Sequence, residues 1–308
     1  MIKAAVIGTG HLGRHHARVY SLLARETAQV ELAAVCDTDL SRAREVAEAY
    51  GARPFTDYRE ALGLVDAVSI VTPTVSHYEI AADCLSAGKD ILLEKPVCAT
   101  LEEARKLTTL ASGKGLILQA GHIERFNPVA GMALPLLDRK RPFFIEAERI
   151  SPFPERSLDV DVTLDVMIHD LDFALHVLGC PAVKEVRAAG ASVVTPGKLD
   201  SVKAWVDFED GRSAFFSASR IAAEKRRKMA FFMEGKIVEA DFLLKKLMVK
   251  TAGGEEHMDS GTAEPLKEEI KDFISCVRTR TAPRVSPREA ECALELALKI
   301  SDTVRSAR

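Results

Sequence analysis

The sequence predicts an α/β protein with a doubly wound parallel sheet in residues 1–120 and an α+β domain with a mostly antiparallel, open sheet in residues 121–308. The first 120 residues alternate short apolar runs with helical patterns, and a glycine-rich turn follows the first run. After Gly121 the pattern changes to stretches in which polar and apolar residues often alternate. Strands that alternate with helices are typical of a parallel sheet, whereas alternating runs joined by turns are typical of antiparallel pairs.

The first elements predict a nucleotide-binding turn. The run Ile2–Ile7 is expected to be a strand and residues 12–26 a helix, and the turn between them is Gly8-Thr9-Gly10-His11-Leu12-Gly13. Strand, glycine turn and helix are the context of a dinucleotide fingerprint, in which the helix N-terminus binds the diphosphate. Gly8 permits the tight turn, Gly10 lets the backbone approach a pyrophosphate, and Gly13 allows close helix–strand packing. We expect these six residues to bind cofactor; the alternative is a glycine turn in another α/β fold.

Asp37 indicates which dinucleotide is bound. It follows the second expected strand, Glu31–Cys36, roughly twenty residues after the glycines. An acid there suits the ribose diol of NAD and repels the 2′-phosphate of NADP, and Thr38 and Asp39 add no cation. We therefore expect residues 1–120 to form an NAD-binding Rossmann domain.

The remaining elements of this domain bring further polar residues to the carboxyl edge of the sheet. We expect strands at 66–71, 90–94 and 116–120, and helices at 40–49, 76–87 and 101–112. Thr72 and Pro73 follow one strand and are expected to line the nicotinamide side, although a simple proline-shaped loop is the alternative. Glu94 and Lys95 end another, where such sheets place their chemistry, and both are expected to bind cofactor. Glu94 is also expected to orient Lys95 or pair with it.

The second domain is expected to combine one open sheet with a few helices. The expected strands are 143–149, 183–194, 201–208, 212–219, 229–233 and 236–241. Helices are expected at 128–138, 265–278 and 287–305, and a loop at 151–161. Glu209-Asp210-Gly211 is a hairpin signal between two of the strands. The last two helices are expected to pack against one or both domains.

Asp165 and His169 carry the chemistry expected of the second domain. They are four residues apart in a helical pattern, so both side chains leave one face. A carboxylate beside an imidazole holds a proton acceptor near neutral pH. With Lys95 they suggest hydride transfer from an alcohol.

Composition excludes several classes of protein. The net charge of −3 gives no bulk electrostatic case for nucleic acid or membrane binding, and the longest apolar runs are far too short to span a membrane. Six cysteines are scattered without a CxxC pair, and no metal-site spacing is present, so we expect no metal. The chain starts on a predicted strand without an export signal, and we expect a cytoplasmic protein.

Three segments together resemble the glucose–fructose oxidoreductase / inositol dehydrogenase / MocA family: the turn Gly8–Gly13, the triplet Glu94-Lys95-Pro96 and the stretch Asp165–His169. The resemblance covers essentially the whole chain. It implies that Lys95 contacts the reacting hydroxyl and that Asp165 and His169 form the acid/base pair. It also implies a substrate-binding second domain whose open sheet mediates a homo-oligomer, a dimer or tetramer.

Two further segments, Gly121–Pro128 and Ser217–Arg220, resemble a branch of this family that oxidises the 3-hydroxyl of UDP-N-acetylglucosamine. A UDP-sugar carries a diphosphate, which arginine binds in a bidentate way. We therefore expect Arg125, Asn127 and Arg220 to bind substrate. The alternatives are an ion pair between domains for Arg125 and a helix N-cap for Asn127. The basic run 225–228 is either a further phosphate site or a solvated hairpin face.

Two other functions stay open. In the first, the protein is a dehydrogenase whose substrate is a free cyclitol or aldose, as in inositol dehydrogenases. In the second, the fold serves as a non-catalytic regulator that senses a dinucleotide. The presence of Lys95, Asp165 and His169 together argues against a regulator, because a sensor has no use for all three.

Overall fold

The computed structural model describes residues 1–137, 142–153 and 160–307, which form two compact units. The first unit contains Met1–His122 and Leu266–Glu291, and the second contains Ile123–Pro265 and Cys292–Arg308. The predicted boundary near residue 120 therefore marks only the first place where the chain passes from one unit to the other. The predicted second domain, 121–308, was expected to be continuous, but the structure returns part of it to the first unit.

The first unit is built on a six-stranded, wholly parallel sheet in the order β3-β2-β1-β4-β5-β6. Its strands are β1 (Ile2–Ile7), β2 (Val30–Cys36), β3 (Arg53–Phe55), β4 (Ala67–Ile70), β5 (Asp90–Glu94) and β6 (Leu118–Gly121). Its longer helices are α1 (His11–Thr27), α2 (Leu40–Tyr50), α4 (His77–Ser86), α5 (Leu101–Lys114) and α8 (Pro265–Thr279). Strands β4 and β5 are buried throughout, as expected of a sheet covered on both faces. The predicted doubly wound fold is confirmed.

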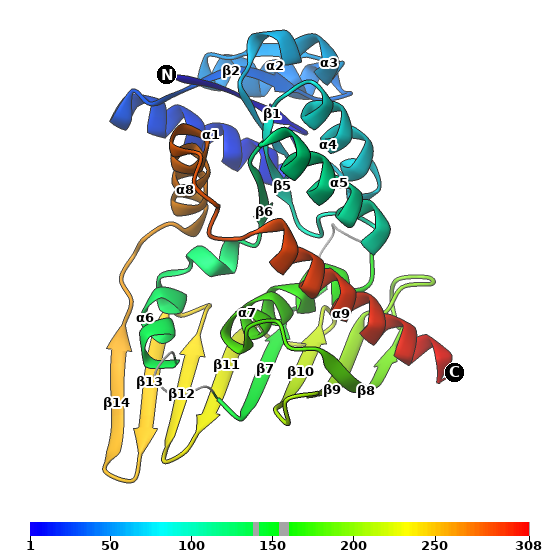
Figure 1. Cartoon of the computed structure of the whole chain (residues 1–308), viewed down its shortest axis with the longest axis vertical. Helices are drawn as coiled ribbons and strands as arrows, with labels where there is room; N and C mark the ends of the chain where they lie inside the picture. The colour runs from blue at the N-terminus through cyan, green and yellow to red at the C-terminus, as the bar shows by residue number, and fades with distance from the viewer. Residues whose placement is uncertain (138–141, 154–159, 308) are drawn as a thin grey trace. The chain divides into compact units, whose positions relative to one another are not determined.

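Helix α8 explains why the domain boundary differs from the prediction. It lies beside α1 on one face of the sheet, while α4 and α5 cover the other (Figure 1). Lys267 of α8 forms an ion pair with Glu26 of α1 at 2.7 Å, and Gln119 of β6 donates to the backbone oxygen of Glu269 at 3.2 Å. The apolar side of α8 is buried here, so this helix completes the core of the first unit.

The second unit is built on an eight-stranded sheet in the order β14-β13-β12-β11-β7-β10-β9-β8. Its strands are β7 (Phe144–Ile150), β8 (Val183–Ala191), β9 (Ser201–Phe208), β10 (Ser213–Ser219), β11 (Arg226–Met233), β12 (Lys236–Asp241), β13 (Lys246–Thr251) and β14 (Gly254–Asp259). Neighbours are antiparallel except for β7 and β10. The predicted, mostly antiparallel sheet is confirmed.

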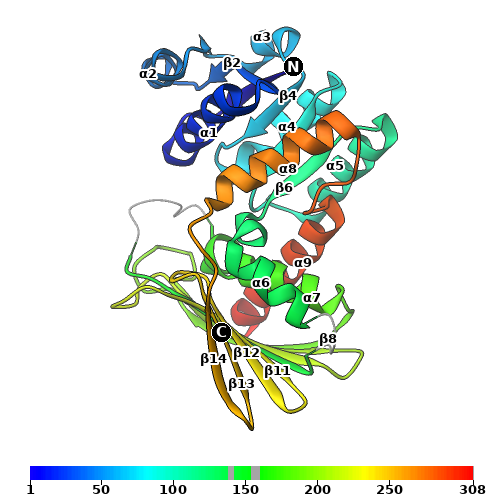
Figure 2. The same ribbon diagram turned by 90° about the vertical axis from the view of Figure 1, so that its left-hand side faces the viewer.

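Helices cover one face of this sheet, as Figures 1 and 2 show for α6 (Pro128–Leu137), α7 (Ile168–Leu178) and the part of α9 (Pro287–Ser306) that belongs to the second unit. Alternate residues of β7 follow this division: Ile145 is buried under the helices, whereas Phe144 on the other face is partly exposed. The uncovered face carries an aromatic group, in which the ring of Phe144 lies 5.0 Å from Trp205 and 5.6 Å from Phe232.

Several predicted elements differ from the structure. Strands β3, β13 and β14 were not predicted; β3 has only three residues, and β14 contains a single apolar residue, Met258, so its apolar pattern is weak. Strand β11 begins at Arg226 rather than 229, and so contains most of the basic run. Position 138 of the helix predicted at 128–138 and most of the loop predicted at 151–161 lie outside the described residues.

Candidate functional site

The glycine turn has the geometry that the sequence predicts. Gly8 has φ +92°, and a Cβ atom there would lie 2.6 Å from the carbonyl oxygen of Val71. A Cβ atom on Gly13 would lie 1.8 Å from the carbonyl oxygen of Gly8, so any other residue would push α1 away from β1. Gly10, in contrast, faces open space within 4 Å. Two glycines therefore close the turn, while the third leaves room for a ligand next to the backbone.

This turn fits a dinucleotide. Gly10 is the N-cap of α1, where no side chain caps the helix in the described structure and no acid lies in the first turn. The amide groups at that end are therefore available to a diphosphate. Thr9 is fully buried, Leu12 half-buried and His11 exposed at the edge of the turn.

Asp37 lies at the tip of β2 and contacts the glycine turn. Its Oδ2 accepts hydrogen bonds from the backbone amide and the hydroxyl of Thr9, both at 2.9 Å. Its Oδ1 accepts from the amide of Asp39 at 3.0 Å. The carboxylate is thus fixed beside the turn while remaining partly exposed, as required for a ribose diol.

The loop after β4 is joined to the loop after β5. Thr72 follows β4, and its carbonyl oxygen lies 2.8 Å from Nε2 of His77. The other ring nitrogen of His77 lies 2.9 Å from the carbonyl oxygen of Pro96. Burial lowers the pKa of His77 although both carbonyls oppose this. Pro73 is exposed and Lys95 is half-buried at the same edge of the parallel sheet.

The side chain of Glu94 is buried in the first unit. It is only 6% exposed; its Oε1 accepts from Nε2 of His16 and its Oε2 from the amide of Lys95, both at 3.2 Å. A Cβ atom on Gly121 would lie 2.9 Å from Glu94 Cδ, so β6 also confines this carboxylate. The structure thus supports the expected orienting role of Glu94, whereas its burial argues against direct contact with cofactor.

A third buried polar residue, which the sequence prediction missed, completes this group. Glu269 of α8 has no exposed surface, and one ligand-type atom each of His16, Glu94 and Glu269 lies within 4.8 Å of the others. Two ionised carboxylates at that separation would repel each other by roughly 3 kcal/mol at an effective dielectric constant of about 20. Burial and the charge of Glu94 raise the pKa of Glu269 well above its usual value. Burial also opposes ionisation of Glu94, but the hydrogen bond from His16 and the charges nearby lower its pKa.

In the second unit, the predicted acid/base pair lies at a change of helix type. Asp165 belongs to a π-helical turn, Thr163–Met167, and His169 to the first turn of α7. The sequence predicted a continuous α-helix here. Such π-turns occur mostly as single turns and often at functional sites. Both side chains are half-buried, so each reaches the surface of the unit.

A buried ion network includes Asp170, the residue that follows His169. Arg149 of β7 donates to Asp170 at 2.7 and 2.9 Å and to Glu124 at 2.7 Å. Burial opposes the charge of Arg149, but these carboxylates outweigh it and raise its pKa. Burial raises the pKa of Asp170, whereas for Glu124 the charge of Arg149 overcomes burial and lowers the pKa. The network ties the start of α7 to the sheet.

Arg125 and Asn127 are bound inside the second unit. Arg125 is 2% exposed and lies 3.4 Å from Asp172. Asn127 is 5% exposed and donates from Nδ2 to Glu124 at 2.9 Å and to the carbonyl of Phe242 at 3.1 Å. Its Oδ1 accepts from the amide of Val129 at 3.2 Å, so Asn127 caps the start of α6. This geometry fits the alternative role of a helix cap for Asn127; the ion pair of Arg125 lies within the second unit and not between domains as the alternative for it supposed.

Arg220 differs most from its expected role. It has no exposed surface, and Nε donates to Asp200 at 2.9 Å while a terminal nitrogen donates to the carbonyl of Val160 at 3.1 Å. Burial opposes ionisation of Asp200, but hydrogen bonds from the backbone amides at 193–195 lower its pKa. A diphosphate can reach this guanidinium only by breaking the pair, so its burial argues against the expected contact with substrate.

The basic run is divided between the two faces of the sheet. Arg226 pairs with Glu148 at 2.8 Å and Lys228 with Asp241 at 3.8 Å, and both belong to the uncovered face. Arg227 faces the helices, where it lies 3.4 Å from Glu124 and keeps 46% of its side chain exposed. Burial lowers the pKa of Arg227.

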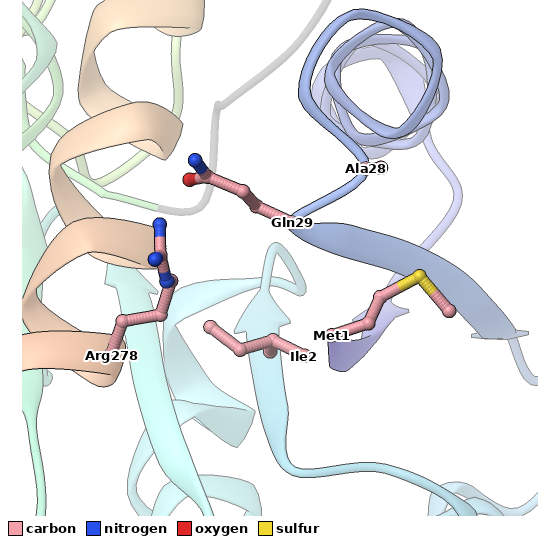
Figure 3. A pocket seen from close by; sticks show the side chains of 5 residues that line it. All are labelled: Met1, Ile2, Ala28, Gln29 and Arg278. Carbon is pink, nitrogen blue, oxygen red and sulfur yellow. The ribbon is translucent and has the colours of Figure 1, made fainter.

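A small pocket of about 180 Å³ lies in the first unit, lined by Met1, Ile2, Ala28, Gln29 and Arg278 (Figure 3). It lies at the amino end of β1, whereas the glycine turn follows the carboxyl end of that strand. It is therefore separate from the nucleotide-binding edge. Among the described helices, none combines the length and apolar character needed to cross a membrane.

Comparison with known proteins shows which family the chain resembles. Residues 2–122 match the model of an oxidoreductase family with an NAD-binding Rossmann fold, and residues 144–238 match the GFO/IDH/MocA C-terminal domain. The chain is 38% identical to UDP-N-acetylglucosamine 3-dehydrogenase of Acidithiobacillus ferrooxidans, over 90% of this chain and 88% of that protein. A solved structure of that enzyme aligns with a TM-score of 0.93 and 36% identity, over 99% of this chain and 98% of the other.

A second relative acts on a different class of substrate, a free inositol, according to its name. The chain is 26% identical to scyllo-inositol 2-dehydrogenase (NAD(+)) of Bacillus subtilis, over 99% of this chain and 94% of that protein. The two family models, the extent of the identity and the fold agree with one another. The chain therefore belongs to the GFO/IDH/MocA family of oxidoreductases with an NAD-binding Rossmann domain.

Proposed function

We propose that this protein is an NAD-dependent dehydrogenase that oxidises the 3-hydroxyl of a UDP-N-acetylhexosamine, with UDP-N-acetylglucosamine as the first candidate. The observation that carries this proposal is the 38% identity to a UDP-N-acetylglucosamine 3-dehydrogenase over 90% of the chain. Identity to the inositol dehydrogenase over a similar length is 26%. Substrate specificity changes readily on one fold, so the proposal requires a direct test.

The proposed chemistry divides between the two units. NAD, when bound at the glycine turn, supplies the hydride acceptor. His169 accepts the proton of the substrate hydroxyl, and Asp165 in the turn before it holds the imidazole for this step. Lys95 donates a hydrogen bond to the same oxygen and stabilises the developing alkoxide. Support for these roles comes from the partial exposure of all three side chains and from the family.

We propose Arg227 as a contact for the diphosphate in place of Arg125 and Arg220. Of the arginines considered, Arg227 combines an exposed side-chain portion of 46% with a position on the helix-covered face of the second unit. A guanidinium there can bind phosphate oxygens in a bidentate way, and Glu124 would keep its shorter ion pair with Arg149 at 2.7 Å.

The test follows NADH absorbance with purified protein, NAD and one substrate at a time: UDP-N-acetylglucosamine, free N-acetylglucosamine or myo-inositol. We expect reduction of NAD with the nucleotide sugar and little with the other two. Lys95→Ala should lower the rate of this reduction about a hundredfold or more. Lys89→Ala should not, because Lys89 lies at the opposite end of β5 and donates to the carbonyl of Val65. Reduction of NAD by inositol alone would favour the cyclitol alternative. Binding of NAD without turnover of any sugar would favour the regulator.

We further propose that the protein is a cytoplasmic homo-oligomer, a dimer or tetramer joined through the uncovered face of the second sheet. The aromatic group of Phe144, Trp205 and Phe232 supports this, because exposed apolar patches on an open sheet commonly mark an interface. Trp205 is 37% exposed in the single chain. Light scattering of the protein and of Trp205→Lys tests the interface: the variant should have the lower mass.

A further inference from the structure

We propose that Glu269 and His16 are positioning residues for Lys95. Together they hold the Glu94 carboxylate, which accepts a hydrogen bond from the backbone amide of Lys95. Glu269 does so as a neutral acid that directs its hydrogen toward Glu94. The inference rests on the proposed catalytic role of Lys95. It assigns a function to a helix, α8, that the chain supplies about 170 residues after β5.

The contacts of Glu94 connect this group to Lys95. Glu94 is the last residue of β5, so its position determines where Lys95 leaves the sheet. Its two carboxylate oxygens are used separately, one by His16 and one by the Lys95 amide. A shift of the carboxylate would therefore move the backbone of Lys95. Displacements of about 1 Å at such positions can cost roughly a hundredfold in rate.

A carboxyl oxygen of Glu269 lies within 4.8 Å of a carboxylate oxygen of Glu94. Glu269 is fully buried, and neither of its carboxyl oxygens has a hydrogen-bond partner among the described residues. A buried, ionised carboxylate without partners is very unfavourable, and here a second carboxylate lies within 4.8 Å. The group becomes favourable when Glu269 carries a proton and Glu94 carries the charge, because Glu94 receives the two N–H donors.

The surroundings of Glu269 favour the same distribution of charge. The titratable groups that face it are Glu94 of β5, His16 and Tyr20 of α1, and Asp272 of its own helix. Two of these are carboxyl groups, which disfavour a further negative charge on Glu269. The Tyr20 hydroxyl is committed to Ser69 at 2.9 Å.

A divalent cation is the competing explanation, because one imidazole and two carboxylates form a possible donor set. We favour the proton because His16 and Glu269 have no exposed surface and Glu94 is only 6% exposed, which leaves little room for a hydrated ion to enter. Metal analysis of the purified protein decides between them. A stoichiometric metal that is lost in Glu269→Gln would overturn the proposal.

The experiment compares two substitutions of similar volume. Glu269→Gln keeps a hydrogen-bond donor in a neutral side chain, whereas Glu269→Leu removes the donor. With the nucleotide sugar we expect the kcat of Glu269→Gln to stay within about threefold of the unmodified protein, and that of Glu269→Leu to fall roughly ten- to a hundredfold. KM for NAD should change little in either variant, because the glycine turn is untouched. Glu268→Gln, an exposed neighbour paired with Lys271, is the matched control.

A second measurement needs no substrate, so it separates failure of this inference from failure of the proposed function. The thermal midpoint of the unmodified protein should fall relative to that of Glu269→Gln as the pH rises from about 6 to about 9, because only glutamate can lose its proton. Parallel midpoints, or equal kcat for the Gln and Leu variants, would overturn the inference. Diverging midpoints in a protein that oxidises no nucleotide sugar would contradict the proposed substrate and leave the protonated Glu269 intact.

Discussion

Replacing Arg220 by alanine tests whether this residue stabilises the fold or binds substrate. In the structure the guanidinium has no exposed surface and donates to Asp200 at 2.9 Å. Arg220→Ala would leave Asp200 buried with its charge uncompensated, although its bonds to three backbone amides would remain. Removing one partner of a buried ion pair typically costs about 3–5 kcal/mol. We therefore expect a loss of this size in the free energy of unfolding.

Chemical denaturation measures this loss, and steady-state kinetics measure the alternative. The matched control is Arg226→Ala, whose side chain is 42% exposed and pairs with Glu148 on the surface. Exposed pairs contribute about 0–1 kcal/mol, so this variant should unfold almost as the unmodified protein does. KM for the nucleotide sugar should change less than about threefold in Arg220→Ala, since no contact with substrate is lost. An unchanged midpoint together with a KM raised tenfold or more would show that the argument from burial is wrong.

Three further outcomes are expected. Asp37→Ala should narrow the preference for NAD over NADP, because the carboxylate that suits a ribose diol also repels phosphate; tighter binding of NADP by the unmodified protein would contradict this. Lys95→Ala and His169→Ala should each lower turnover about a hundredfold or more while NAD affinity, measured by titration, stays within a few-fold. The unfolding free energy of Glu269→Gln should rise relative to the unmodified protein by up to about 1.4 kcal/mol per pH unit, in the window that starts above the ordinary pKa of 4.5 and ends at the raised pKa of Glu269. The sign follows because, in that window, the native state keeps a proton that the unfolded state has lost.

The nucleotide-binding half was predictable because its signals are local. The turn Gly8–Gly13 requires glycine for reasons that lie within the turn and the adjacent strand, and the positive φ of Gly8 and the close approach at Gly13 follow. Asp37 was identified from its distance along the chain, and it does contact Thr9. In a parallel sheet the carboxyl ends of the strands meet at one edge, so the residues that follow each strand are candidates for one shared site.

The arginines show what the sequence leaves open. We expected Arg125 and Arg220 to bind substrate because a diphosphate requires cationic partners. The sequence does not show which of its cationic side chains are exposed. Their partners, Asp172 and Asp200, are separated from them by 47 and 20 residues. Whether a guanidinium meets solvent or a carboxylate depends on packing between distant segments. Charge in a sequence therefore indicates a binding role only when burial is also known.

Glu269 differs from the arginines, because the sequence does carry a signal for it. Positions 266, 269, 270 and 273 follow the i, i+3, i+4, i+7 spacing of one helix face, and leucine, isoleucine and phenylalanine occupy the other three. An acid among them must be buried, and a buried acid needs either a partner or a proton. His16 occupies an equivalent place on the buried face of α1, between Gly13 and Tyr20. The two anomalies could have been found separately from the sequence, but only the structure shows that both residues lie within 4.8 Å of the same glutamate, the one that precedes Lys95.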